Sequence, residues 1–228
     1  IADEYKINSK NVALSHGIVG LLETLSKMFI EVGDEVIIPH STFGLYEDLS
    51  KLMGADIIKS QVSNGVVDVE DIVKKITDNT KLIWLANPNN PTGTIINDND
   101  FKYLVDNLPS HVWLILDEAY YEFAAGNDYP DSIEKVNQGE KIILTRTFSK
   151  AYGLAGLRLG YVLANKDVIK TIKKVSQPFN ANKAGLAAAK AVLADDKFPE
   201  KAINKIKKSR DFMISRLKEM DCEVYPSY

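Results

Sequence analysis

The 228-residue sequence predicts an α/β fold, a three-layer sandwich in which helices cover both faces of a mostly parallel central sheet. Short apolar runs alternate with amphipathic stretches, and Gly, Pro, Asn or Asp separates one from the next. Several of the apolar runs contain hardly any polar residue, as expected of strands that are buried on both faces. Together these two patterns indicate repeated strand–helix units.

The predicted elements follow this alternation along the chain. Apolar residues recur at three- and four-residue spacing from Ile18 to Val32, which predicts a helix that begins just after Gly17. Strands are expected at Glu35–Ile38, Ile57–Ser60, Leu82–Ala86, Val112–Leu116, Lys141–Thr145, Leu159–Ala164 and, near the end of the sequence, Glu223–Tyr225. Further helices are expected at Thr42–Met53, Val69–Ile76, Asp98–Asn107 and Asp167–Val175, as a closely packed Ala-rich helix at Ala184–Ala194, and as a long helix with a solvated basic face after Pro199.

The composition excludes several classes of protein. With 45% hydrophobic and 26% charged residues the sequence is typical of a globular protein, and no apolar run is long enough to cross a membrane. The net charge of −3 argues against a nucleic-acid partner, because binding to phosphate backbones needs clustered Lys and Arg. Cys222 is the only cysteine and the three histidines are scattered, so we expect no disulfide within the chain, no metal site and a cytoplasmic location.

Three polar motifs directly follow predicted strands. In open parallel sheets, ligands bind beyond the carboxyl ends of the strands, so these motifs are candidates for a site. They are Asn87–Gly93, Asp117–Phe123, and Thr147–Lys150 leading to Gly156–Gly160. Each motif alone also has a structural explanation, as a turn, a helix cap or a surface ion pair.

Taken in order, the motifs resemble the fold-type-I pyridoxal-phosphate enzymes, and among them the class I/II aminotransferases. The resemblance covers most of the chain, and its closest sub-pattern looks like the histidinol-phosphate aminotransferase group, in Asn87–Gly93, Asp117–Phe123 and the run Ser149–Gly160. It implies that residues 1–196 form the large, cofactor-binding domain of that fold. Residues 197–228 would then hold a connecting helix and the start of a smaller domain.

The resemblance assigns the reactive end of the cofactor to four residues. Lys150 matches the lysine that holds pyridoxal 5'-phosphate as a Schiff base and then moves a proton between the substrate Cα and the cofactor C4' atom. Asp117 matches the carboxylate that keeps the ring nitrogen protonated. Tyr120 and Asn90 match the two donors to the phenolic oxygen of the cofactor.

The phosphate and the ring face have their own expected partners. Arg158 matches the arginine that binds the phosphate, with hydroxyl donors expected at Thr147 and Ser149. Phe43 matches the aromatic residue that stacks on the ring, although a core position would also suit it.

Further phosphate contacts are expected from Gly17, Ile18 and Val19, at the start of the first helix, where free N–H groups favour an anion. The histidinol-phosphate group usually has Gly-Ser followed by acidic residues there, so this loop departs from that group, and Ile18 and Val19 offer only backbone donors. Tyr46, His16 and His40 receive no role.

The reaction is less well defined than the cofactor. The resemblance implies transfer of an amino group between an L-amino acid, with histidinol phosphate as one candidate, and a 2-oxo acid. A threonine-phosphate decarboxylase, a β-lyase, and a binding domain without chemistry are the alternatives. The family's substrate-binding arginine and a phosphate-contacting tyrosine from a homodimer partner find no match here, so we expect this sequence to be part of a longer protein.

Overall fold

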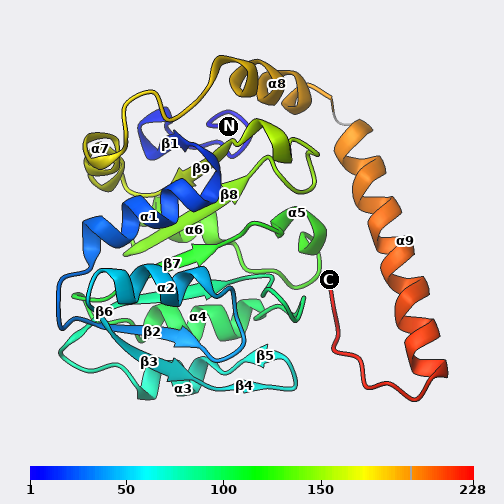
Figure 1. Ribbon diagram of the computed structural model, residues 1–228, viewed down its shortest axis with the longest axis horizontal. Coiled ribbons are helices and arrows are strands. Elements are labelled where there is room, and N and C mark those ends of the chain that lie inside the picture. Colours follow the sequence, from blue (N-terminus) through cyan, green and yellow to red (C-terminus); the bar gives the residue numbers. More distant parts are fainter. Residues whose placement is uncertain (196) are drawn as a thin grey trace.

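The computed structural model describes residues 1–195 and 197–228, and it contains a seven-stranded sheet with helices on both faces (Figure 1). The strand order is β1-β9-β8-β7-β6-β2-β3. The strands are β1 (Val12–Ser15), β2 (Glu35–Pro39), β3 (Asp56–Ser60), β6 (Thr80–Ala86), β7 (Trp113–Asp117), β8 (Ile142–Thr147) and β9 (Gly160–Leu163). Only β9 runs against its neighbours in this sheet, which confirms the predicted mostly parallel α/β fold.

The helices form two layers with a separate apolar core beneath each. On one face lie α1 (Gly17–Phe29), α2 (Leu45–Leu52) and α7 (Lys166–Val175). On the other lie α3 (Val69–Lys74), α4 (Asp98–Asp106), α6 (Ser132–Asn137) and α8 (Lys183–Leu193). Side chains of one strand alternate between the two cores: Ile83 and Leu85 of β6 face the second layer, whereas Trp84 faces the first.

Most helices begin at a side-chain cap, and α1 does not. Asp68, Asn97 and Asn165 each accept a hydrogen bond from a backbone N–H in the first turn of α3, α4 and α7. At the start of α1 the capping position is His16, whose side chain makes no such bond, and Gly17 has a φ of 70°. The first N–H groups of α1 are therefore left for another acceptor.

Several elements were not expected from the sequence. They are strand β1, the hairpin of β4 (Val62–Ser63) and β5 (Val66–Val67), the short helices α5 (Tyr121–Ala124) and α6, and two 3-10 turns, η1 (Ser9–Asn11) and η2 (Ala155–Leu157). Short length explains most of these omissions, because four residues or fewer give no periodicity to detect.

Three expectations were wrong. Helix α1 ends at Phe29, so Val32 lies outside it and is 87% exposed. In α8 only Gly185 and Ala189 are buried, so the Ala-rich helix exists but is not closely packed. The segment Glu223–Tyr225 forms no strand.

Helix α9 (Lys197–Glu219) stands away from the body of the molecule and has no buried residue (Figure 1). The chain then returns, and the Tyr228 backbone N–H donates to the Gly93 carbonyl at 2.9 Å. The predicted domain boundary at residue 196 lies outside the described residues, and the division into two domains stays a prediction. Within the described part of the chain, no helix is both long and apolar enough to span a membrane.

Candidate active site

The predicted site residues meet at one cavity of about 230 Å³. It lies where β6, β7 and β8 end, and the loop after β2 and the start of α1 close it. All of the predicted site residues except Gly17 line it: Ile18, Val19, Phe43, Asn90, Asp117, Tyr120, Thr147, Ser149, Lys150 and Arg158. Segments from residue 18 to residue 158 of the chain thus contribute to a single cavity.

Asp117 is the last residue of β7, and its buried carboxylate points into this cavity. One oxygen, Oδ2, accepts a hydrogen bond from the Tyr46 hydroxyl at 2.7 Å, and Oδ1 accepts one from the Ala119 backbone N–H at 3.1 Å. Burial raises the pKa of Asp117 to about 6, although both of these hydrogen bonds oppose the rise. No salt bridge reaches Asp117 from the described residues, so the carboxylate has donors but no cationic partner.

The Lys150 amine lies over the ring of Tyr120, the aromatic residue predicted to act with it. Its Nζ atom sits 5.1 Å from the centre of the Tyr120 ring. Lys150 is exposed, on the turn after β8, where its amine can reach a molecule in the cavity.

The Asn87–Gly93 loop is held by its other asparagines, which leaves Asn90 facing the cavity. Asn89 donates to the Ser41 carbonyl at 2.8 Å and accepts from the Thr42 hydroxyl at 2.8 Å. Asn87 accepts from the Ile96 backbone N–H at 3.0 Å. These bonds fix the loop against the segment that carries Phe43, so the loop and the ring-stacking candidate are positioned together.

Arg158 and the start of α1 form the end of the cavity that favours an anion. Arg158 follows the η2 turn in a left-handed conformation, with φ of 49°, and its Nη1 atom donates to the Ala155 carbonyl at 3.0 Å. This turn brings the guanidinium against Gly17: a Cβ atom added there would lie 2.5 Å from Arg158 Nη2. Gly17 does not line the cavity, but its lack of a side chain makes room for the arginine.

A second glycine brings two distant segments into backbone contact. A Cβ atom on Gly160 would lie 2.7 Å from the Gly17 carbonyl carbon and 2.8 Å from the Ile18 nitrogen. Strand β9 therefore supports the free N-terminal turn of α1 from behind. The guanidinium, the backbone N–H groups and the helix dipole all favour negative charge at this end.

Thr147 and Ser149 turn toward the cavity, whereas the residue between them turns away. The Thr147 hydroxyl accepts a hydrogen bond from the Ser149 backbone N–H at 3.0 Å. Phe148 is fully buried in the opposite core. The Thr147 hydroxyl also donates a long hydrogen bond to the Leu159 carbonyl at 3.4 Å, so both hydroxyl groups lie at the cavity and their role as donors to a phosphate stays a prediction.

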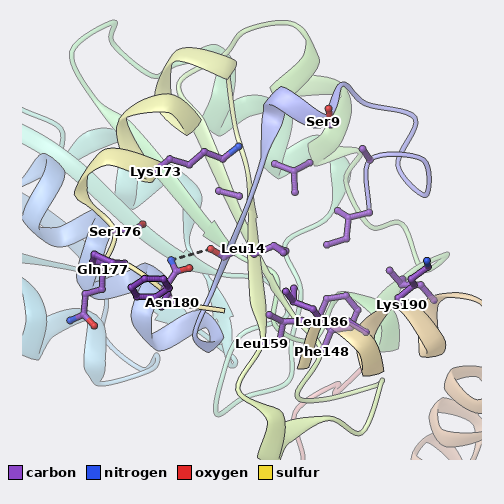
Figure 2. A pocket seen from close by; sticks show the side chains of 18 of the residues that line it. Ser9, Leu14, Phe148, Leu159, Lys173, Ser176, Gln177, Asn180, Leu186 and Lys190 are labelled. Atoms are coloured by element: carbon purple, nitrogen blue, oxygen red, sulfur yellow. Dashed lines mark hydrogen bonds between the residues drawn. The ribbon is translucent and has the colours of Figure 1, made fainter. Parts of the chain in front are cut away.

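Phe148 faces a second and larger cavity of about 900 Å³, which Figure 2 shows with Leu14, Leu159 and Leu186 around it. Asn180 donates there to the Leu14 carbonyl at 3.3 Å (Figure 2). None of the residues predicted to bind the cofactor lines this cavity. Despite its smaller volume, the cavity at the strand ends is the one with converging polar groups.

Behind the site, on the other side of the sheet, lies a buried cluster of charges. Arg146 Nε donates to Glu118 Oε2 at 2.7 Å, and the two side chains are 1% and 0% exposed. The rings of Tyr5 and Tyr121 lie over the guanidinium at 4.7 and 3.6 Å from its central carbon. Asp117 and Glu118 are neighbours in sequence, yet they serve opposite faces of the sheet.

The donor set of the cavity fits a phosphorylated pyridine cofactor. A protonated ring nitrogen would supply the cation that Asp117 lacks, and the anionic end would hold a phosphate. Phe43 offers a flat apolar face between these two ends. Among the described residues no cluster of His, Cys, Asp or Glu could hold a metal ion.

Tyr46 is the residue at this site that the sequence analysis left without a role. It lines the cavity and bonds Asp117 directly. Helix α2 begins at Leu45, so Phe43 lies outside it and helical spacing gives no link between the two residues. The bond to Asp117 joins residues 71 positions apart, and no local pattern in the sequence signals it.

The fold and this cavity define an α/β protein with an exposed lysine, a buried carboxylate and an uncapped helix start at the ends of parallel strands. The family model for aminotransferase class I and II matches residues 2–228, and the chain belongs to this family.

Individual relatives agree with this membership. The chain is 34% identical over 228 residues to histidinol-phosphate aminotransferase 1 of Idiomarina loihiensis, covering all of this chain and 62% of that protein. A solved structure of a histidinol-phosphate aminotransferase from Sinorhizobium meliloti, in complex with pyridoxal-5'-phosphate, is 29% identical with a TM-score of 0.93, over 99% of this chain and 61% of that one. A putative histidinol-phosphate aminotransferase from Erwinia carotovora atroseptica is 26% identical with a TM-score of 0.94, over 99% and 66%. The chain therefore spans about three fifths of the length of these relatives.

Proposed function

We propose that this protein is a pyridoxal-phosphate-dependent aminotransferase that moves an amino group between an L-amino acid and a 2-oxo acid. Histidinol phosphate is the amino donor we propose first, because the relatives described above carry that name. The observation that carries the proposal is the meeting of Lys150, Asp117 and Arg158 at one cavity. A protein that only bound phosphate would have no need for Lys150 and the buried Asp117.

The positions of the side chains around the cavity support the binding roles that we propose. Arg158, Thr147, Ser149 and the first N–H groups of α1 hold the phosphate by charge-assisted and neutral hydrogen bonds. The Asp117 carboxylate would pair with the ring nitrogen and keep a proton on it. Phe43 would pack on the flat face of the ring. Tyr120 and Asn90 would donate to the phenolic oxygen.

The proton transfer falls to Lys150. When bound, pyridoxal phosphate withdraws electrons from the substrate Cα and makes its hydrogen acidic. Lys150 would accept the Cα proton as general base and later return it as general acid. Its exposed position shortly after β8, at the cavity, supports this role.

The test uses the full-length protein with added pyridoxal phosphate. Reduction with borohydride should leave a mass increase of one reduced cofactor on the peptide that contains Lys150, and Lys150→Ala should abolish it. Lys183→Ala, on the exposed first turn of α8, is the control and should label like the unaltered protein. Absence of labelling in the unaltered protein would overturn the proposal.

The reaction itself is tested with a panel of amino donors. A transaminase should convert the bound cofactor to its amino form and regain the starting absorbance when a 2-oxo acid is added. Release of CO₂ would instead support a decarboxylase, and release of pyruvate a β-lyase. Cofactor binding without any of these products would support a binding domain.

We also propose that the protein is a homodimer in the cytoplasm. The family resemblance supports the first statement, and the single cysteine, Cys222, is in keeping with the second. Light scattering after gel filtration gives the mass in solution, and a monomer at micromolar concentration would contradict the dimer. Cell fractionation tests the location.

A further inference from the structure

Tyr46 lies behind the site and contacts two residues with proposed cofactor roles. It is fully buried on α2, and its hydroxyl donates to Asp117 Oδ2 at 2.7 Å. Its ring meets the Phe43 ring edge to face, with 5.5 Å between the centroids and 85° between the planes. Tyr46 therefore joins the partner of the ring nitrogen to the residue proposed to pack on the ring.

A cycle of contacts fixes the orientation of Tyr46. Its ring stacks on Trp84 with a centroid distance of 5.2 Å and an angle of 1°. The Trp84 indole N–H donates to the Ser50 hydroxyl at 3.1 Å, and that hydroxyl donates to the Tyr46 carbonyl at 2.7 Å. With the ring held against Trp84 and the backbone tied through Ser50, the phenol has one direction in which to donate.

The Tyr46 phenol is a neutral donor and the Asp117 carboxylate is a charged acceptor, so each suits the other. Burial, and then the nearby Asp117 carboxylate, raise the pKa of the Tyr46 phenol well above its ordinary value, so the phenol keeps its proton. Burial also raises the pKa of Asp117, and the hydrogen bond from Tyr46 is the largest effect opposing that rise. Tyr46 thus stabilises the charged form of the carboxylate.

We propose that Tyr46 is a positioning residue that acts through Asp117: it keeps that carboxylate ionised and aimed at the cavity, so that the proton shared with the cofactor stays on the ring nitrogen. This inference rests on the proposed function for the identity of the cofactor. It does not depend on which amino acid is the substrate, because Tyr46 acts on the cofactor side of the site.

Removal of the phenolic oxygen has a defined consequence. In Tyr46→Phe the stack on Trp84 and the edge contact with Phe43 can remain, and only the donor to Asp117 is lost. The carboxylate then becomes more basic, since nothing replaces the lost stabilisation of its charge. A more basic Asp117 draws the shared proton away from the ring nitrogen.

The first measurement is made on the loaded, full-length enzyme with a cofactor labelled with nitrogen-15 in the ring. In the unaltered protein the resonance should lie at the position of a protonated pyridine. In Tyr46→Phe it should move toward the unprotonated position, with Asp117→Asn marking the full loss. A resonance that stays in place in Tyr46→Phe would overturn the proposal.

Two control variants separate this role from packing. Tyr103→Phe removes a hydroxyl from a partly exposed tyrosine of α4 and should leave the resonance unchanged. Ser50→Ala removes a fully buried hydroxyl from the same cluster but leaves the Tyr46 phenol, so its effect should be clearly smaller than that of Tyr46→Phe. A shift in Tyr103→Phe as large as that in Tyr46→Phe would show that the effect is not specific to Tyr46, and the proposal would fail.

A second measurement needs no cofactor and so distinguishes this inference from the proposed function. The carboxyl carbon-13 signal of Asp117, identified by its loss in Asp117→Asn, is titrated in the cofactor-free protein. Its pKa should be about one unit higher in Tyr46→Phe than in the unaltered protein. An equal Asp117 pKa in both proteins would overturn the role of Tyr46. If the pKa of Asp117 is higher in Tyr46→Phe but the protein does not bind the cofactor, the result would count only against the proposed function.

Discussion

Glu118 and Arg146 illustrate how strongly single residues behind the site are constrained. Both side chains are almost completely withdrawn from water, and Glu118 also accepts hydrogen bonds from Ser132 at 2.7 Å and from Tyr129 at 3.0 Å. A buried charge is tolerated when it is paired and hydrogen-bonded. Loss of one partner leaves the other uncompensated.

Glu118→Gln should lower the free energy of unfolding by about 3–5 kcal/mol, because it leaves the Arg146 charge buried without its counter-ion. Urea unfolding followed by circular dichroism measures the change. Glu219→Gln, which breaks an exposed pair with Arg216 on α9, is the control and should cost less than about 1 kcal/mol. Equal losses in both variants would contradict this account of the buried pair.

Glu122 near this cluster should make stability depend on pH. Its carboxylate oxygens are buried without a hydrogen-bond partner, and burial raises the pKa of Glu122 to about 7. A group whose pKa is higher in the folded state stabilises the fold below its unfolded pKa, and this contribution is lost as the pH rises through about 7. Between pH 5 and pH 8, Glu122→Gln should therefore lose less stability than the unaltered protein.

Urea midpoints at several pH values provide the measurement for Glu122. Asp117 contributes a change of the same sign, so the informative quantity is the difference between the two proteins rather than either curve. The exposed Glu140→Gln is a control that should follow the unaltered protein at every pH. Parallel curves for Glu122→Gln and the unaltered protein would contradict the proposed titration.

At the scale of elements, the contact between α1 and β9 depends on glycine. Gly160→Ala should place its methyl group within 2.7 Å of the α1 backbone, force the two elements apart and weaken cofactor binding. Gly156→Ala is a matched control, since an added Cβ there meets nothing within 4 Å. Cofactor titrations followed by absorbance compare the two variants, and equal affinities would show that this close approach is not needed for binding.

The sequence predicted the long elements well because their patterns repeat. Strands β6, β7 and β8 each contain an almost continuous apolar run, which identified them in the sequence. The three site motifs follow these strands directly. Strand β1 was not predicted, because Val12–Ser15 is short and finds its partner, β9, about 150 residues later. The packing of α8 was overestimated, since alanine composition does not indicate which face has a neighbour.

The candidate site likewise contains residues that a local sequence motif predicts and residues that depend on tertiary contacts. Residues that sit in a motif, such as Asn90 and Lys150, could be identified from the sequence and are brought to one cavity. Tyr46 acts through a tertiary hydrogen bond to a residue 71 positions away, and no local pattern encodes that contact. The backbone contact of Gly17 with Gly160 likewise became apparent only in three dimensions.

At the scale of the whole molecule, the cavity collects the start of α1, the segment after β2 and the ends of β6, β7 and β8, so a ligand there should stabilise the fold broadly. At a free cofactor concentration 100 times the dissociation constant, the gain is about 2.7 kcal/mol. Thermal unfolding of the full-length protein with and without pyridoxal phosphate should show a higher melting temperature with the cofactor. Arg158→Gln should reduce the shift, and no shift in the unaltered protein would contradict the proposed binding.

The two consecutive acids at the end of β7 also bear on how the chain avoids misfolded forms. A slip of this strand by one residue would turn Glu118 into the cavity and Asp117 toward Arg146. The longer carboxylate would then meet Tyr46, and the shorter one would fall short of the guanidinium. The one-residue slip is therefore unfavourable on both faces of the sheet. We expect the folded population to contain a single register of β7 even before any cofactor binds.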